Sequence, residues 1–222
     1  MIRPLQWDSN FFSSRIGKID IGNDGDFAID QEDFAQFDMV YIFSPHDLNL
    51  DLPLMDIKIT MGKSVKLKSK ANEIKLFDPS VDNYDQLLEL VYLSGHQSRF
   101  LKDSFFGRKK FEKMYQTWIN NSLHKEKSKV LIYRDHGNIA GFVSFYYNKV
   151  NAAIELIAVD PSFQGKNIGT KLLTSVESFL SYGFELQVAT QATNVKARDF
   201  YLKNDFEIIN KQYIYHFAPH SL

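Results

Sequence analysis

The stretch AVDPSFQGKNIGTKLL, residues 158–173, joins an apolar run to a helical pattern through a short glycine-bearing loop. A strand that enters such a loop and then a helix directs several backbone N–H groups, and the positive end of the helix dipole, at one point. Gly165 permits close approach of the backbone, Lys166 adds positive charge, and Thr170 places a hydroxyl in the first helical turn. The loop is therefore predicted to bind an anion such as phosphate.

This loop differs from two common phosphate-binding patterns. A Walker A loop would need Gly-Lys-Ser/Thr after four intervening residues, and a dinucleotide-binding turn would need G-x-G-x-x-G. Taken alone, the loop has an equal alternative as an ordinary strand-to-helix turn. Evidence from the rest of the chain is needed to distinguish an anion-binding loop from an ordinary turn.

Composition narrows the class of protein. Of 222 residues, 44% are hydrophobic, which is ample for a packed core. Lys and Arg number 26 against 27 Asp and Glu, so nucleic acid is not an expected partner. The absence of cysteine excludes disulfides and a cysteine nucleophile and suits a reducing compartment. Because no run is apolar enough for a membrane span or a signal peptide, we expect a cytoplasmic protein.

Residues 1–70 are predicted to form a small N-terminal α/β lobe. Its expected elements are strands at 16–21, 38–44 and 55–61 and a short helix at 31–37. A lysine-rich segment, KSVKLKSKANEIK (63–75), marks the boundary with the second domain, 71–222. Its alternation favours a solvated edge strand, with a basic arm for an anionic ligand as the alternative.

Residues 71–222 mix helical and strand periods. Helices are predicted at 83–96, 106–124, 170–182 and 194–205, and strands at 128–135, 138–148, 151–160, 184–191 and 207–218. Asp82 is the expected N-cap of the first helix, and His136-Gly137-Asn138 the clearest hairpin turn. The order predicts an α/β fold of the α+β type, with a mixed, mostly antiparallel sheet flanked by helices.

The segment IELIAVDPSFQGKNIGTKLL (154–173) resembles the acetyl-coenzyme A motif of the GCN5-related N-acetyltransferases, the GNAT family. The family pattern is Gln or Arg, two residues, Gly, one residue, then Gly or Ala; Asn167 stands at the middle glycine. Asn is the residue that best replaces glycine at a positive φ. The resemblance implies a GNAT fold with acetyl-CoA as co-substrate, its pyrophosphate on the loop amides and its pantetheine arm along the preceding strand. The implied cofactor-binding residues are Leu156, Ile157, Ala158, Val159, Gln164, Gly165, Lys166, Asn167, Ile168, Gly169, Thr170 and Asn194.

A second motif, NVKARDFYLKNDFEII (194–209), resembles the closing helix and strand of the same family. The resemblance implies that Tyr201 donates a proton to the departing thiolate of coenzyme A, a role that suits a positioned phenol. The alternative is a core aromatic beside Phe200. Glu155, on the cofactor strand, is the best candidate for a general base if the reaction needs one, and otherwise an exposed strand residue.

Scattered stretches resemble the dTDP-fucosamine acetyltransferases of bacterial surface-glycan synthesis: PLQWDSNFFSSRIG (4–17), GHQSRF (95–100), YQTWINNSL (115–123) and LQVATQATNVKARDFY (186–201). The resemblance implies that the acceptor is the primary amine of a nucleotide-linked amino-dideoxy sugar. Such a substrate calls for a cation, an aromatic shelf and polar groups. The substrate-binding candidates are His96, Gln97, Ser98, Arg99 and Phe100. His96 has an equal alternative as a helix C-cap, and Arg99 as a structural ion pair.

Other readings stay open. The enzyme could acetylate a polyamine, an amino acid or a protein N-terminus, or the chain could bind acetyl-CoA without turnover. No metal site is predicted, because the six histidines are dispersed. The aromatic stretch QYIYHF (212–217) is a candidate interface for a homodimer.

Overall fold

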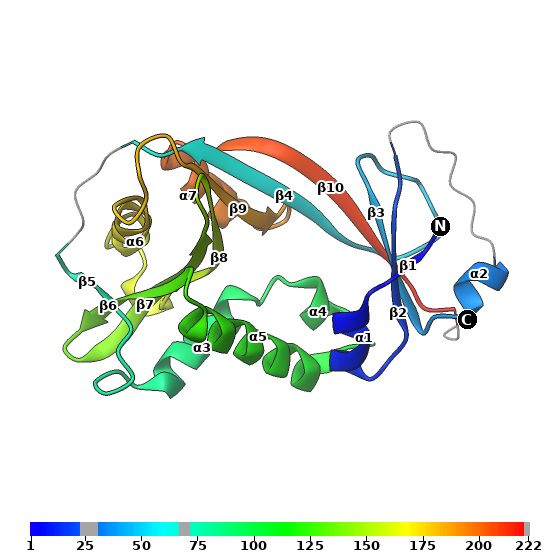
Figure 1. The fold of residues 1–222 in the computed structure, drawn as a ribbon, viewed down its shortest axis with the longest axis horizontal. Helices are drawn as coiled ribbons and strands as arrows, with labels where there is room; N and C mark the ends of the chain where they lie inside the picture. The colour runs from blue at the N-terminus through cyan, green and yellow to red at the C-terminus, as the bar shows by residue number, and fades with distance from the viewer. Residues whose placement is uncertain (23–30, 67–71, 220–222) are drawn as a thin grey trace.

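The computed structural model describes residues 1–22, 31–66 and 72–219. Ten strands of this part of the chain form one twisted sheet in the order β1-β2-β3-β10-β4-β9-β8-β7-β6-β5 (Figure 1). Their bounds are β1 Arg3–Pro4, β2 Ile16–Asp20, β3 Met39–Ser44, β4 Leu54–Ser64, β5 Ile74–Leu76, β6 Ser128–Asp135, β7 Asn138–Tyr147, β8 Asn151–Val159, β9 Glu185–Gln191 and β10 Glu207–Phe217. The β2–β3 and β8–β9 pairs are parallel and the others antiparallel. The predicted fold class is therefore confirmed.

The helices cover both faces of the sheet (Figure 1). Their bounds are α1 Gln6–Phe12, α2 Gln31–Ala35, α3 Tyr84–Ser94, α4 Arg99–Lys102, α5 Gly107–His124, α6 Ile168–Glu177 and α7 Val195–Lys203, with a 3-10 turn at Pro161–Phe163. Helices α3 and α5 pack on one face of β6–β8 and α6 packs on the other. Because side chains alternate along a strand, Phe142 of β7 joins the core under α3 and α5 while Val143 joins the core under α6. None of the helices in the described segments is long and apolar enough to cross a membrane.

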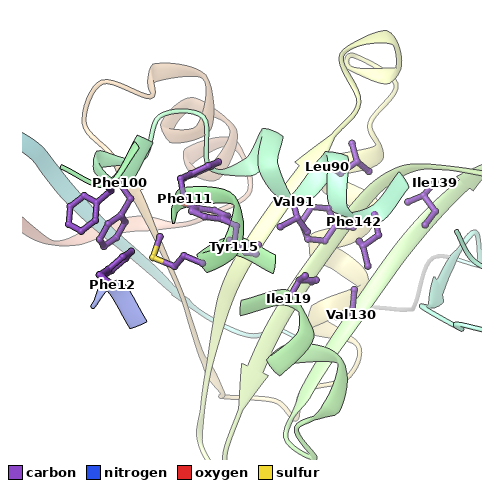
Figure 2. Close-up of a cluster of buried hydrophobic side chains, with 14 of the residues drawn as sticks. Phe12, Leu90, Val91, Phe100, Phe111, Tyr115, Ile119, Val130, Ile139 and Phe142 are labelled. Carbon is purple, nitrogen blue, oxygen red and sulfur yellow. The ribbon is translucent and has the colours of Figure 1, made fainter. Parts of the chain in front are cut away.

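The core on the α3–α5 face continues toward the N-terminal segment (Figure 2). There Phe12 of α1 packs against Phe100 and Phe106, with ring centres 6.0 Å and 4.7 Å away. All three side chains are at most 6% exposed. Helices α1 and α4 are therefore fixed side by side by buried aromatic contacts, although the sequence analysis predicted neither helix.

The lysine-rich segment departs from its prediction. Lys63 and Ser64 end β4, an interior strand whose earlier residues pair with both β9 and β10, although these two residues pair with β9 alone. The prediction of a solvated strand is wrong at Lys63, whose side chain is buried. The Lys63 side chain is 6% exposed and forms an ion pair with Glu177 of α6. An edge strand does form at 74–76, where β5 pairs with β6 alone. Residues 67–71 lie outside the described chain.

Local boundaries also differ from the predicted ones. The N-cap of α3 is Asn83, whose carboxamide accepts hydrogen bonds from two backbone amides of the first turn. Asp82 instead binds the Arg134 guanidinium through both carboxylate oxygens, at 2.6 Å and 2.7 Å. Helix α6 ends at Glu177 rather than at residue 182.

The sheet runs without interruption across the predicted boundary between residues 70 and 71. Strand β4, from the predicted N-terminal lobe, lies between β9 and β10 of the predicted second domain. Strand β10 in turn pairs with β3. The division into two domains stays a prediction, but the strands of both parts share one sheet.

Candidate active site

Strands β8 and β9 separate at the centre of the sheet. They pair only from Asn151 to Ile154, opposite Glu185 to Val188. Further on, β8 stays with β7 as far as Val159, and β9 stays with β4 as far as Gln191. We call this divergence the splay. It leaves one edge of residues 156–159 without a strand partner, and such an edge can pair with an extended ligand.

A β-bulge lies at the start of the splay. Ser144 of β7 pairs with Leu156, and Phe145 pairs with Ile154, so Glu155 is the extra residue on β8. Bulges bend and twist the strand that carries them, which helps β8 to turn away from β9. The sequence contained no signal for this bulge, because it depends on the register between two strands.

The loop after β8 has the geometry expected of an anion site. Gly165 has a φ of 80° and Asn167 a φ of 62°, both in the left-handed region. Asn167 is the N-cap of α6 but its side chain makes no capping hydrogen bond. The first amides of the helix are therefore not blocked by a capping side chain, as an anion site requires. Gln164 Nε2 donates to the Val159 carbonyl at 3.2 Å and ties the loop to the end of β8.

Ile168 and Gly169 position helix α6 relative to the core and to helix α7. The Ile168 side chain is 2% exposed and anchors the start of α6 in the core, so its main chain alone faces outward. At Gly169, an added Cβ would lie 3.0 Å from the Phe200 ring of α7. A side chain would have to displace that ring, so this glycine permits the close approach of α6 and α7. That contact brings Tyr201, the next residue of α7, under the same core.

Helix α7 carries the second motif. Asn194 is its N-cap, and its carboxamide oxygen accepts from the Ala197 amide at 3.2 Å. Tyr201 is 3% exposed and packs among the residues of the α6-side core. Burial raises the pKa of the Tyr201 hydroxyl, so the group keeps its proton at neutral pH.

Glu155 reaches the splay from the opposite face. It is exposed, and its carboxylate accepts a hydrogen bond of 2.8 Å from the Ser122 hydroxyl of α5. The candidate base thus belongs to the α3–α5 face and the candidate acid to the α6 face. Their roles stay predictions, but this placement lets one group act on each side of the splay.

The residues predicted to bind the acceptor differ in their exposure and contacts. His96 is exposed and its Nδ1 lies 2.9 Å from the Leu93 carbonyl, which matches the alternative of a helix C-cap. Gln97 contacts the other nitrogen of the His96 ring at 3.4 Å. Ser98 is the buried N-cap of α4, and Phe100 is buried in the core. Ser98 and Phe100 therefore hold the short helix that carries Arg99.

Arg99 differs from its neighbours because its functional group has no ion-pair partner in the described chain. The guanidinium carbon lies 4.3 Å, 5.4 Å and 5.9 Å from the ring centres of Phe100, Tyr41 and Phe43. Its Nε is buried without a hydrogen-bond partner. The alternative role of Arg99, a structural ion pair, is therefore not found among the described residues. A cation on aromatic faces with an open donor suits a bound anion.

Sequence reasoning missed a buried polar cluster beside Arg99. Tyr41 and His216 are 1% and 3% exposed, with ring centres 4.8 Å apart. The Tyr41 hydroxyl and His216 Nε2 are both buried without partners. His216 Nδ1 lies 2.5 Å from the Asp103 carboxylate. Burial lowers the pKa of His216, so its neutral form is favoured. The only available signal was a polar residue inside each apolar strand.

No group of three or more His, Cys, Asp or Glu in the described residues is arranged to hold a metal ion. The prediction that the protein needs none stays open. The candidate interface stretch at 212–217 lies inside the sheet between β3 and β4, and Ile214 to Phe217 are buried by this chain itself. Homodimerisation likewise stays a prediction.

Comparison with known proteins shows what this chain is similar to. The model of the acetyltransferase (GNAT) family matches residues 97–206. The spore coat polysaccharide biosynthesis protein SpsD of Bacillus subtilis is 24% identical over 147 residues, 65% of this chain and 51% of that protein. The chain thus spans about half the length of this relative.

Solved structures share the fold. A conserved protein of unknown function from Staphylococcus epidermidis has a TM-score of 0.63 at 12% identity, over 92% of this chain and 84% of its own. A GCN5-related N-acetyltransferase from Sphaerobacter thermophilus has a TM-score of 0.53 at 14% identity, over 82% of this chain and 60% of its own. At this level of identity the likeness is one of fold.

Proposed function

We propose that this chain is an acetyl-CoA-dependent N-acetyltransferase of the GNAT family, whose model matches residues 97–206. We further propose that its acceptor is the primary amine of a nucleotide-linked amino-dideoxy sugar used in surface-glycan synthesis. The observation that carries the acceptor assignment is Arg99, a cation without an ion-pair partner in the described chain, held on three aromatic rings. The name of the relative SpsD, a spore coat polysaccharide biosynthesis protein, supports the same class of product.

The residues of the loop and the splay fit acetyl-CoA. The uncapped amides of α6 and the loop at 164–169 would bind its pyrophosphate, and the open edge at 156–159 would pair with its pantetheine amides. When bound there, acetyl-CoA supplies an acetyl group activated as a thioester. Asn194, at the start of α7, would contact the pantetheine region.

The remaining chemistry is proton transfer by this chain. Glu155, whose orientation is held by Ser122, would accept a proton from the acceptor amine directly or through one water. Tyr201 holds its proton on the hydroxyl because burial raises its pKa, and it would donate that proton to the leaving thiolate. With the base and the acid on opposite faces of the splay, one would deprotonate the attacking amine and the other would protonate the departing thiolate.

A thiol-release assay tests the acceptor class. Because the protein has no cysteine, a thiol reagent would read only the coenzyme A that is released. The acceptors should be dTDP- and UDP-linked amino sugars, the same amino sugars without a nucleotide, spermidine, amino acids and a peptide with a free N-terminus. Tyr201→Phe is the test variant, and Tyr182→Phe, at a residue 75% exposed, is the matched control.

Each outcome has a distinct meaning. Release with nucleotide-linked amino sugars alone would support the proposal. Release with spermidine, an amino acid or the peptide, and not with the nucleotide sugars, would replace the acceptor class while leaving the reaction unchanged. If coenzyme A binds and no acceptor is used, the acceptor assignment fails and a non-catalytic role becomes the better explanation.

A further inference from the structure

Three cations meet on the face of the sheet that carries α4. Lys18 Nζ lies 4.1 Å from the centre of the Phe43 ring, and the Arg99 guanidinium carbon lies 5.9 Å from the same centre. Lys58 interacts electrostatically with both of these cations. The three residues come from β2, β4 and α4, and we call them the cation cluster.

Strand register places the cation cluster next to the splay. Lys58 is the lateral neighbour of Gln191, the last residue of β9. Adjacent strands lie roughly 4.8 Å apart, so Lys58 is one strand away from the open end of the splay, beyond Val188, the last residue of β9 that pairs with β8. Its neighbours Ile57 and Ile59 pack with the α6-side core, and side chains alternate, so Lys58 lies on the α4 side.

The like charges in the cation cluster are incompletely neutralised. Lys18 forms an ion pair of 2.8 Å with Asp20, whereas Lys58 and Arg99 have no ion pair within the described ranges. Burial, reinforced by the two other cations, lowers the pKa of the Lys58 ammonium group. An anion bound between these cations would relieve their repulsion.

Other polar groups near Arg99 also bear on whether the cation cluster would bind an anion. Asp8 and Asp56 interact electrostatically with Arg99 without an ion-pair contact among the described residues. Burial raises the pKa of both carboxyl groups, while the charge of Arg99 acts in the opposite direction. The buried Tyr41 hydroxyl has no hydrogen-bond partner and lies beside Arg99, where it can donate to a ligand. Arg99 Nε and the Tyr41 hydroxyl are therefore donors that no described residue satisfies.

We propose that the cation cluster is the subsite for the diphosphate of the acceptor, so that the N-terminal part of the chain selects phosphate-bearing acceptors. The proposal rests on the proposed function, because it assigns the anionic part of the same nucleotide-linked substrate. In such a substrate one sugar ring separates the amine from the diphosphate, and in the sheet one strand separates the splay from Lys58. Lys18 and Lys58 both precede the matched family region at 97–206.

Calorimetric titration of the full chain tests the subsite without relying on turnover. Inorganic pyrophosphate and UDP are the probes, titrated with coenzyme A at saturation so that the loop at 164–169 is already filled. The test variant is Lys58→Gln, and the matched control is Lys211→Gln. Lys211 lies on β10 opposite Ile59, one residue along from the Lys58 pair, and is therefore on the other face of the sheet.

We expect Lys58→Gln to weaken UDP binding about tenfold or more, because a charge-assisted contact to phosphate is lost, and Lys211→Gln to leave it unchanged. Raised salt should weaken the wild type more than Lys58→Gln. Wild-type protein that binds neither probe, or equal affinity of the two variants, would overturn the subsite. Binding of UDP but not pyrophosphate would still place a nucleoside diphosphate there if Lys58→Gln weakens it.

The two proposals can fail separately. If a nucleotide-linked amino sugar is acetylated and Lys58→Gln leaves its KM unchanged, the subsite is wrong and the proposed function stands. If UDP binding depends on Lys58 but no nucleotide-linked amino sugar is acetylated, the subsite stands and the proposed acceptor is wrong. Lys18→Gln gives an independent check, with the same direction expected for KM.

Discussion

Replacing Tyr201 with phenylalanine removes one oxygen from a side chain that is 3% exposed. In the described residues the hydroxyl makes no hydrogen bond, so the substitution breaks no internal contact and the Tm should hold. If Tyr201 is the proton donor, kcat should fall about 10²- to 10⁴-fold, which corresponds to about 2.7–5.4 kcal/mol of barrier. The dissociation constant of acetyl-CoA should stay within about twofold, because the loop and strand that bind it are unchanged.

The pH profile sharpens this test. Burial raises the pKa of Tyr201 above the ordinary value of 10.0, so its proton is retained as the pH rises to that value. Wild-type kcat should therefore show no decline from loss of this acid below pH 10. Turnover of Tyr201→Phe equal to that of Tyr182→Phe, at unchanged Tm, would refute the acid role and leave Tyr201 as a core aromatic.

Three further changes test the structure around the site. Asn167→Gly should match or exceed the wild type in Tm and coenzyme A affinity, whereas Asn167→Ala, forced to a φ near 62°, should cost about 1–2 kcal/mol; equal effects would contradict a strained loop. Lys63→Met removes a buried ion-pair partner of Glu177 and should lower the free energy of unfolding in urea by up to about 3–5 kcal/mol, with much of this recovered when Glu177→Met is added; a cost that persists would point to lost packing. His216 has its pKa lowered by burial, so below pH 6.5 the unfolded chain gains a proton that the folded chain resists, and stability should fall with falling pH. His216→Gln should reduce the pH dependence of the unfolding free energy between pH 6.5 and about 5. If the slope is unchanged, the pH dependence comes from other groups.

The loop that we propose for acetyl-CoA binding could be located from the sequence because its signals are local. The loop at 164–169 lies between one strand and one helix, and its positive φ values follow from residue type at two positions, Gly165 and Asn167. Helical and strand periods likewise located the longer elements from residue 83 onward, although they missed the short helix α4 and placed the end of α6 too late. Each of these inferences needed only one continuous stretch of the chain.

The site that we propose for the acceptor could not be predicted in the same way because it depends on pairing between distant strands. Lys18, Tyr41 and His216 lie in one lateral row across β2, β3 and β10, yet nothing in the sequence fixes that register. Prediction failed at Lys63 for the same reason. The alternating pattern identified the strand correctly, but whether a strand is central or at an edge is decided by which other strands flank it.

The placement of β4 explains why the two sides of the site occur together. This strand contributes Lys58 on the acceptor face and Ile59 and Met61 to the α6-side core. Because β4 lies between β9 and β10, its pairing with Gln191 holds β9 on the far side of the splay while β7 holds β8 on the near side. The splay that we propose for the cofactor and the cation that we propose for the acceptor therefore depend on the same strand, and a change that shifts β4 should disturb both.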